Sequence, residues 1–217
     1  MALRINETVP DFTADTTEGE LSFHDWIGDG YAVLFSHPKD FTPVCTTELG
    51  TMAGMAGEFA KRNAKIIGIS VDPVSDHHRW KEDILSYTGH SVAYPMIGDP
   101  EMKVAKLFDM LPASEERVEG RTPADNQTVR TVFVIGPDKK LKLSLTYPMT
   151  TGRNFDEILR ALDSIQLTAE HKVATPANWS VGEDVIITAA VSDEEATEKF
   201  GEFDKKLPYL RTTKSPV

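Results

Sequence analysis

The chain has 217 residues, of which 40% are hydrophobic and 26% charged, a composition typical of globular proteins rather than of disordered or fibrous chains. Its 34 acidic residues outnumber its 23 Lys and Arg residues, and the formal net charge of -11 repels nucleic-acid phosphates and anionic lipid headgroups. We therefore expect no nucleic-acid partner and no membrane partner.

The apolar runs of the sequence are short. The longest are of strand length and fall short of the roughly 18 to 20 residues that a membrane span needs. Near the N-terminus, Glu7 and Pro10 come before any apolar stretch of the kind that a secretory signal requires. We therefore expect a cytoplasmic protein.

The first half of the chain alternates between strand and helix patterns. Residues 31–35 and 66–71 are near-continuous apolar runs, which predict strands buried on both faces of a parallel sheet. Between them, Thr42 and Pro43 form a helix start, with a hydroxyl at the N-cap and proline at the first helical position. Apolar residues at helical spacing continue to residues 61–63, so this stretch predicts a β-α-β unit.

Two more helices are expected before residue 110. Ser75 starts a helix that carries Trp80 and Ile84 on one face. Asp99, followed by Pro100, predicts the cap of a third helix. The alternation of strands and helices therefore continues, as in an α/β fold.

From residue 131 the pattern changes. Residues 131–135 and 141–145 read as two strands joined by a turn, which predicts a hairpin. Asn154 and Glu157 form a capping box for a helix with one apolar stripe.

The C-terminal part breaks into short pieces, so we divide the chain into residues 1–168 and a small domain or arm at residues 169–217. The second part contains a strand at residues 185–187 and an acidic segment at residues 193–200. It is too short to form a core of its own, and we expect it to pack on the body of the chain or on a partner subunit.

The chain contains one cysteine, Cys45, which excludes intrachain disulfides and zinc sites built from several cysteines. The six histidines form no i,i+4 pair, and the adjacent His77 and His78 point to different faces of a helix. We therefore expect no metal and no cofactor.

Two interpretations of Cys45 are open at this point. With Thr42 as the N-cap, Cys45 is the third residue of the helix, where unsatisfied backbone N–H groups and the helix dipole favour a thiolate. Free cysteines are also among the most buried residue types and often act only as small inert hydrophobes, which composition alone favours.

The neighbours of Cys45 favour a reactive thiol. Residues 37–45 directly follow a predicted buried strand, at the edge where open α/β sheets place ligand sites. The spacing Pro-x-x-x-Thr-x-x-Cys, filled by Pro38, Thr42 and Cys45, resembles the active-site motif of the peroxiredoxins. Residues 35–49 look like the one-cysteine (Prx6-type) branch of that family. Similar strings recur at residues 9–12, 136–140, 150–155 and 174–176, and at Trp179.

This resemblance implies a thioredoxin-like fold with a small C-terminal domain or arm, and a peroxidase that reduces hydrogen peroxide and organic hydroperoxides. It makes Cys45 the peroxidatic nucleophile, Thr42 a hydrogen-bonding partner of thiolate and peroxide, and Pro38 a shield against water. It also implies that Arg130 lies beside the sulfur and that Arg153 lies near the pocket. The alternatives are ordinary structural roles: a salt-bridge residue for Arg130, a cap for Thr42 and a turn for Pro38.

Two further residues have supporting roles in this interpretation. His37 could hydrogen-bond a sulfenic acid beside the pocket, or it could only cap the strand that precedes Pro38. Glu48 could hold Arg130 or Arg153 through a charge-assisted bond, as the family pattern implies, or it could only favour the helix N-terminus electrostatically.

The lone cysteine also determines the type of catalytic cycle. Without a second cysteine, Cys45 sulfenic acid cannot be resolved within the chain, so an external reductant is required. Glutathione, ascorbate, a small dithiol or a partner protein would all serve. The alternative function is a peroxide-sensing or holdase-type oligomeric scaffold. The resemblance favours a homodimer or a larger homo-oligomer.

The Prx6-type resemblance raises a second activity, lipid hydrolysis through a Gly-x-Ser-x-Gly string. The matching residues 28–32 read Gly-Asp-Gly-Tyr-Ala and lack the serine. A glycine cannot supply a nucleophilic hydroxyl, so we expect no hydrolase activity through that motif.

Overall fold

The computed structural model describes residues 3–113 and 127–216. Contacts between residues divide the chain into two compact units, Met1–Arg153 and Asn154–Val217. This division lies before helix α5 (Phe155–Glu170), whereas the division expected from the sequence lies inside its last turns. The helix groups with the second unit because Leu167, near its C-terminal end, packs in one apolar cluster with Val173, Trp179 and Val185.

The first unit is built on a seven-stranded sheet with the order β2-β1-β5-β4-β3-β6-β7, counted among the described residues. The strands are β1 (Thr13–Thr16), β2 (Gly19–Ser22), β3 (Tyr31–Ser36), β4 (Ala64–Ser70), β5 (Met96–Gly98), β6 (Arg130–Ile135) and β7 (Leu141–Tyr147). The parallel pairing of β3 with β4 and the antiparallel hairpin of β6 with β7 confirm two expectations from the sequence. Strand β3 lies between β4 and β6, so its carboxyl end lies inside the sheet rather than at an edge.

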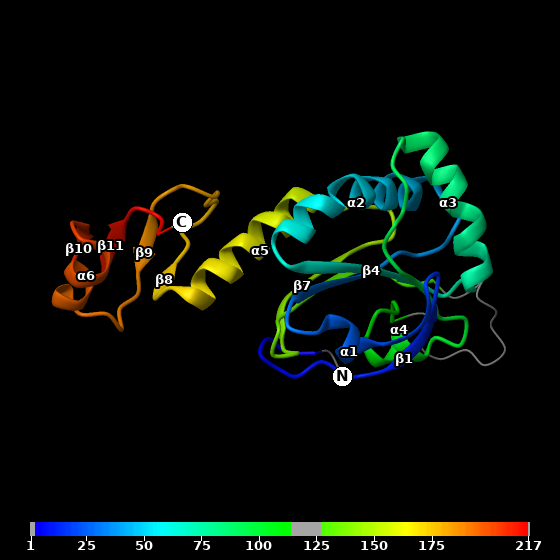
Figure 1. Ribbon diagram of the computed structural model, residues 1–217, viewed down its shortest axis with the longest axis horizontal. Helices are drawn as coiled ribbons and strands as arrows, with labels where there is room; N and C mark the ends of the chain where they lie inside the picture. Colours follow the sequence, from blue (N-terminus) through cyan, green and yellow to red (C-terminus); the bar gives the residue numbers. More distant parts are fainter. Residues whose placement is uncertain (1–2, 114–126, 217) are drawn as a thin grey trace. The chain divides into compact units, whose positions relative to one another are not determined.

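Helices cover both faces of this sheet. The first unit contains α1 (Phe23–Ile27), α2 (Pro43–Lys61), α3 (Val74–Thr88) and α4 (Lys103–Leu107). Figure 1 shows α2 and α3 on one side of the sheet and α1 and α4 on the other. The side chains of β3 alternate accordingly: Ala32 and Leu34 join the apolar cluster of the α1 and α4 face, which leaves Val33 and Phe35 for the opposite face.

Two helix starts differ slightly from the sequence expectation. Helix α3 begins at Val74 rather than at Ser75. Helix α4 begins at Lys103, after a left-handed Met102, but Asp99 still caps it because its carboxylate accepts hydrogen bonds from the backbone N–H groups of Lys103 and Ala105.

The second unit has a sheet of its own. Besides α5 it contains β8 (Val173–Ala174), β9 (Val185–Ile187), α6 (Asp193–Phe200), β10 (Asp204–Leu207) and β11 (Leu210–Thr213), and the sheet order is β10-β11-β9-β8. The unit buries two small apolar clusters, around Trp179 and around Val191, where the sequence led us to expect no core. Asn154 caps α5, but the Glu157 side chain pairs with Arg160, so this half of the expected capping box is replaced by an ion pair.

Within the described part of the chain, no helix has both the length and the apolar character that a membrane crossing requires.

Candidate active site

Cys45 lies in the first turn of α2, directly beyond the carboxyl end of β3. Helix α2 begins at Pro43 with Thr42 as its N-cap, which confirms the expected position of Cys45 as the third helical residue. The side chain of Cys45 is fully buried. Its thiol therefore faces the positive end of the helix dipole away from bulk water, where negative charge on sulfur is stabilised.

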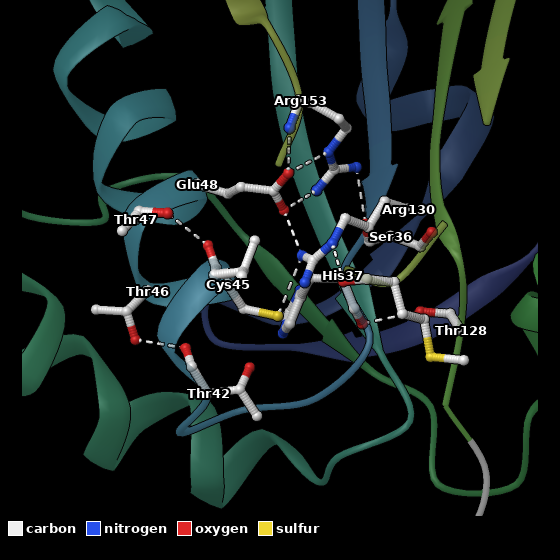
Figure 2. Close-up of polar contacts among 12 residues, drawn as sticks. Ser36, His37, Thr42, Cys45, Thr46, Thr47, Glu48, Thr128, Arg130 and Arg153 are labelled. Carbon is white, nitrogen blue, oxygen red and sulfur yellow. Dashed lines mark hydrogen bonds and ion pairs between the residues drawn. The ribbon is translucent and has the colours of Figure 1, made fainter. Parts of the chain in front are cut away.

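Arg130, the first residue of β6, contacts the sulfur. Its Nη1 lies 3.3 Å from Cys45 Sγ and also donates to Glu48 Oε2 at 2.7 Å (Figure 2). Its Nε donates to the carbonyl oxygen of Met149 at 2.8 Å. The guanidinium group is thus held by the carboxylate of Glu48 and the carbonyl oxygen of Met149, and its Nη1 lies against the sulfur.

Glu48 connects both arginines, as Figure 2 shows. Arg153 donates to it through Nε, at 2.9 Å from Oε1, and through Nη2, at 2.6 Å from Oε2. Burial alone would raise the pKa of Glu48, but hydrogen bonds and charge from Arg153, with the charge of Arg130, lower it. One carboxylate between two guanidinium groups leaves a net positive charge beside Cys45.

Arg153 also ties the site to the sheet. Its Nη1 donates to the carbonyl oxygens of Ser36, at 2.8 Å, and Thr131, at 3.1 Å, at adjoining ends of β3 and β6. Its backbone N–H donates to Glu48 Oε1 at 2.8 Å. This guanidinium therefore holds Glu48 and joins it to the ends of β3 and β6.

Thr42 differs from the expected side-chain cap. Its hydroxyl donates to the carbonyl oxygen of Lys39 at 2.8 Å and makes no capping hydrogen bond to the helix. The backbone carbonyl of Thr42 instead accepts from the N–H and the hydroxyl of Thr46. Because the hydroxyl hydrogen is engaged, Thr42 Oγ1 has only lone pairs to offer a ligand. Pro38 is buried in the same loop.

His37 belongs to a buried group of three side chains. Its Nε2 lies 2.7 Å from Asp40 Oδ1, and Asp40 Oδ2 lies 2.5 Å from His77 Nδ1. Burial lowers the pKa of His37 below 6.5, and the charge of His77 adds to that effect. Burial alone would raise the pKa of Asp40, but hydrogen bonds to both imidazoles lower it to about 2.

These three side chains offer the atoms of a metal site, within 4.8 Å of one another. The N···O distances of 2.5 and 2.7 Å are those of direct hydrogen bonds. Ligands around a tetrahedral zinc ion, each about 2.0–2.1 Å from the metal, lie more than about 3 Å apart. The group is therefore arranged for hydrogen bonding in this structure.

The structure brings all seven sequence-predicted residues together around the carboxyl end of β3: Cys45, Thr42, Pro38, Arg130, His37, Glu48 and Arg153. Sequence reasoning missed Asp40 and His77. Asp40 lies inside the motif string, three residues after His37, so its position in the sequence could have predicted a contact between the two side chains. His77 comes from α3, 37 residues further along the chain, and nothing in the local pattern indicated its contact. The expectation that His77 and His78 face different sides is confirmed, since His77 is buried and His78 is exposed.

The buried thiol, the donors beside it and the helix N-terminus suit a nucleophilic sulfur that displaces an oxygen leaving group. Comparison with known families agrees. Residues 5–144 match the AhpC/TSA family, and residues 164–202 match the C-terminal domain of 1-Cys peroxiredoxin. The chain therefore belongs to the peroxiredoxins, in their one-cysteine branch.

Individual relatives match over nearly the full length. The chain is 50% identical to Peroxiredoxin-6 of Rattus norvegicus over 99% of this chain and 98% of that protein. It is 48% identical to 1-Cys peroxiredoxin PER1 of Triticum aestivum, over 98% of each. Among solved structures, the C45S mutant of Peroxiredoxin 6 of Arenicola marina superposes with a TM-score of 0.92 at 47% identity, covering 99% of both chains.

The yeast mitochondrial 1-Cys peroxiredoxin, whose structure addresses thiol resolution via the glutathione/thioredoxin systems, gives a TM-score of 0.91 at 50% identity, over 98% of this chain and all of that one. This chain accordingly has the thioredoxin-like fold with a C-terminal arm. It is a peroxidase that reduces hydroperoxides through a single peroxidatic cysteine and is regenerated by an external thiol or other reductant.

Proposed function

We propose that Cys45 is the peroxidatic residue and that Arg130 positions its thiolate. The observation that carries this assignment is the 3.3 Å contact between Arg130 Nη1 and the buried Sγ of Cys45. The thiolate attacks the hydrogen-bearing oxygen of the hydroperoxide, an S–O bond forms, and the O–O bond breaks. The sulfur keeps that O–H as a sulfenic acid, and the departing alkoxide or hydroxide takes a proton from solvent.

Thr42 and Pro38 complete the reaction site in this proposal. Because its own hydrogen is bound by the carbonyl of Lys39, the Thr42 hydroxyl accepts the hydrogen of the incoming peroxide. Arg130 stabilises the charge that grows on the departing oxygen, since a guanidinium keeps its charge and cannot itself act as the acid. The buried ring of Pro38 excludes water from the sulfur.

Glu48 and Arg153 are positioning residues for Arg130. Glu48 accepts from both guanidinium groups, so it keeps the N–H of Arg130 aimed at the sulfur. His37 acts after the attack, when its Nδ1 accepts the O–H of Cys45 sulfenic acid. Support for this role is that Nδ1 is buried and has no hydrogen-bond partner among the described residues.

The external reductant is a thiol in our proposal. The yeast relative, at 50% identity, is described as resolved via the glutathione/thioredoxin systems, so glutathione and thioredoxin are the first reductants to test here. We also propose that the chain works as a homodimer, which sedimentation analysis would test. The cytoplasmic location stays a prediction, since one relative is mitochondrial, and cell fractionation would test it.

The test compares the wild type with Cys45→Ser, which is close to cysteine in volume but keeps its proton at neutral pH. One equivalent of hydrogen peroxide is expected to add one oxygen to the wild type by intact mass spectrometry, and excess peroxide a second. Cys45→Ser is expected to add none, with an unchanged circular dichroism spectrum. Retained peroxide turnover in the folded variant would overturn the mechanism.

The same assay separates peroxidase from sensor. Sustained peroxide consumption with glutathione or thioredoxin is the expected result. A stoichiometric burst that stops with each of the candidate reductants would instead favour the peroxide-sensing or holdase scaffold.

A further inference from the structure

The carboxylate of Asp40 lies between two imidazole rings, and all three side chains are buried. Asp40 belongs to the loop between β3 and α2, and His77 belongs to α3. Asp40 is itself held in place, because its backbone N–H donates to Asp72 Oδ2 at 2.8 Å. Ser70 donates to Asp72 as well, at 2.8 Å, so the loop is anchored to the end of β4.

His77 has an acceptor on each side. Its Nε2 lies 3.0 Å from the carbonyl oxygen of Ile97, and its Nδ1 lies 2.5 Å from Asp40 Oδ2. A carbonyl and a carboxylate can only accept, so both ring nitrogens of His77 carry hydrogen. His77 is therefore an imidazolium that neutralises the charge of Asp40 without exposing either group to water.

The same reasoning determines which ring nitrogen of His37 carries the hydrogen. Its Nε2 faces Asp40 Oδ1 at 2.7 Å, so the hydrogen lies on Nε2. Burial lowers the pKa of His37 and favours the neutral ring, which carries one hydrogen only. Nδ1, on the far side of the ring from Asp40, is left with a bare lone pair and has no partner in the described part of the chain.

We propose that Asp40 and His77 are positioning residues that hold His37 in its Nε2–H tautomer, so that Nδ1 is an acceptor for the O–H of Cys45 sulfenic acid. This inference rests on the proposed function. His37 directly follows the last residue of β3 and lies in the same site as Cys45 and Arg130 (Figure 2). The ion pair formed by Asp40 and His77 thus determines which kind of hydrogen bond His37 can make.

The tautomer has a chemical consequence for further oxidation. The ionised sulfenate is the nucleophile that attacks a second hydroperoxide. In this step the sulfur gains a second oxygen, the O–O bond breaks, and an alkoxide or hydroxide leaves. A hydrogen-bond acceptor beside the sulfenic acid favours its protonated form, whereas an Nδ1–H donor would favour the sulfenate. Holding His37 as an acceptor therefore slows conversion of the sulfenic acid to sulfinic acid.

Asp40→Asn and Asp40→Leu form a matched pair for the test. In Asp40→Asn, the Ile97 carbonyl keeps a hydrogen on Nε2 of a neutral His77, whose Nδ1 then accepts from the asparagine NH₂. The asparagine oxygen consequently faces His37 Nε2, and the tautomer is kept. Leucine has a similar shape but no hydrogen-bond acceptor, so nothing keeps the hydrogen of His37 on Nε2. His78→Phe, at the exposed neighbour of His77, is the negative control.

The first measurement is the tautomer in the reduced protein, from two-bond ¹H–¹⁵N correlation spectra of ¹⁵N-histidine-labelled chain. We expect Nε2–H for His37 and a doubly protonated His77 in the wild type, the Nε2–H form of His37 in Asp40→Asn, and an Nδ1–H population in Asp40→Leu. An Nδ1–H or doubly protonated His37 in the wild type would overturn the inference.

The second measurement is the rate of sulfinic acid formation under excess peroxide. We expect an increase of about tenfold in Asp40→Leu, the effect of one pKa unit on the sulfenic acid, and the wild-type rate in Asp40→Asn and His78→Phe. An unchanged rate in folded Asp40→Leu would contradict the proposal. Should that variant not fold, His77→Phe replaces it in the test. Without the imidazolium of His77, the carboxylate of Asp40 favours a second proton on His37, which makes Nδ1 a donor, and the same increase in rate is expected.

The two measurements separate this inference from the proposed function. Absence of sulfenic acid in the peroxide-treated wild type would refute the proposed function, while the spectra of the reduced protein would still report the tautomer. Normal sulfenic acid formation with the wrong tautomer would refute the positioning role of Asp40 and His77 alone.

Discussion

Glu48 explains how two arginines can be buried around one cysteine. Each guanidinium would be costly to bury alone, but this carboxylate accepts from both of them, and carbonyl oxygens of the sheet and of Met149 take further N–H groups. The positive charge that is not neutralised by Glu48 lies at Arg130, against the sulfur. The site therefore keeps its charge fixed in space before any substrate arrives.

Replacing Arg130 tests this arrangement. We expect Arg130→Met to slow the attack on peroxide more than Arg130→Lys, because lysine keeps the charge but loses the planar fork. Loss of one or two of these hydrogen bonds costs about 2 to 4 kcal/mol of barrier, roughly 30-fold to 1000-fold in rate. Stopped-flow oxidation at fixed pH measures it, with Arg160→Met in the second unit as control. Near-wild-type rates in both Arg130 variants would assign that residue to structure only.

The buried titratable groups also predict how stability depends on pH. Burial lowers the pKa of His37 below 6.5, so the unfolded chain binds a proton there more readily and stability decreases as pH falls through that range. The pKa of Asp40 falls from 3.8 to about 2, which contributes about 2 kcal/mol above pH 4 that is lost towards pH 2.

Urea unfolding at a series of pH values measures both contributions. The free energy of unfolding is expected to decrease in two stages, first below pH 6.5 and then below pH 4. In Asp40→Asn the second stage is expected to be smaller. A wild-type stability that rises on acidification from pH 6 to pH 5 would contradict the assignment of a buried neutral His37.

Helix α2 positions Cys45, and its placement depends on close packing against α3. A Cβ added at Gly50 would lie 2.7 Å from Cβ of Thr88 and closer still to its Cγ2, nearer than real atoms approach. Only glycine allows α2 to lie at this distance from α3, so the element that presents the thiol is placed by a residue just over one turn past the site.

Gly50→Ala is therefore expected to destabilise the protein by about 1 to 3 kcal/mol, the range for overpacking. Gly57→Ala, in the same helix with open space around it, is expected to stabilise by about 0.5 to 1 kcal/mol through helix propensity. Urea unfolding measures both. The double variant Gly50→Ala with Thr88→Ala should recover part of the lost stability. Equal stability of Gly50→Ala and Gly57→Ala would show that α3 shifts to accommodate the added methyl group at no cost in free energy.

For the whole molecule, the net charge of -11 predicts different salt effects on the two halves of the cycle. Hydrogen peroxide is neutral, so the oxidation rate should not change with salt. Glutathione is an anion, so its reaction with the oxidised protein should accelerate as salt shortens the screening length from about 30 Å at 0.01 M to about 10 Å at 0.1 M. Stopped-flow rates over this range measure it, with neutral dithiothreitol as the matched reductant. A glutathione rate that falls with salt would mean that positive charge near the pocket outweighs the net charge.

Much of the fold follows from local signals in the sequence. The apolar runs of β3 and β4, the hairpin of β6 and β7, and the start of α2 at Thr42 and Pro43 all depend on residues within a few positions of one another. The same local start puts Cys45 in the first helical turn. The count of one cysteine is enough by itself to determine that no disulfide can form within the chain.

Only the tertiary structure decided the partners of the polar side chains. Glu48 and Arg153 are 105 residues apart, and Asp40 and His77 are 37 apart, so their contacts depend on the strand order and on where α3 packs. The sequence placed the hydroxyl of Thr42 on the helix, whereas the loop carries the carbonyl of Lys39 close enough to take it. The physical reason is range: apolar periodicity and capping act over three or four residues, while a hydrogen bond is decided by distances of a few tenths of an ångström between elements that meet only in the folded chain.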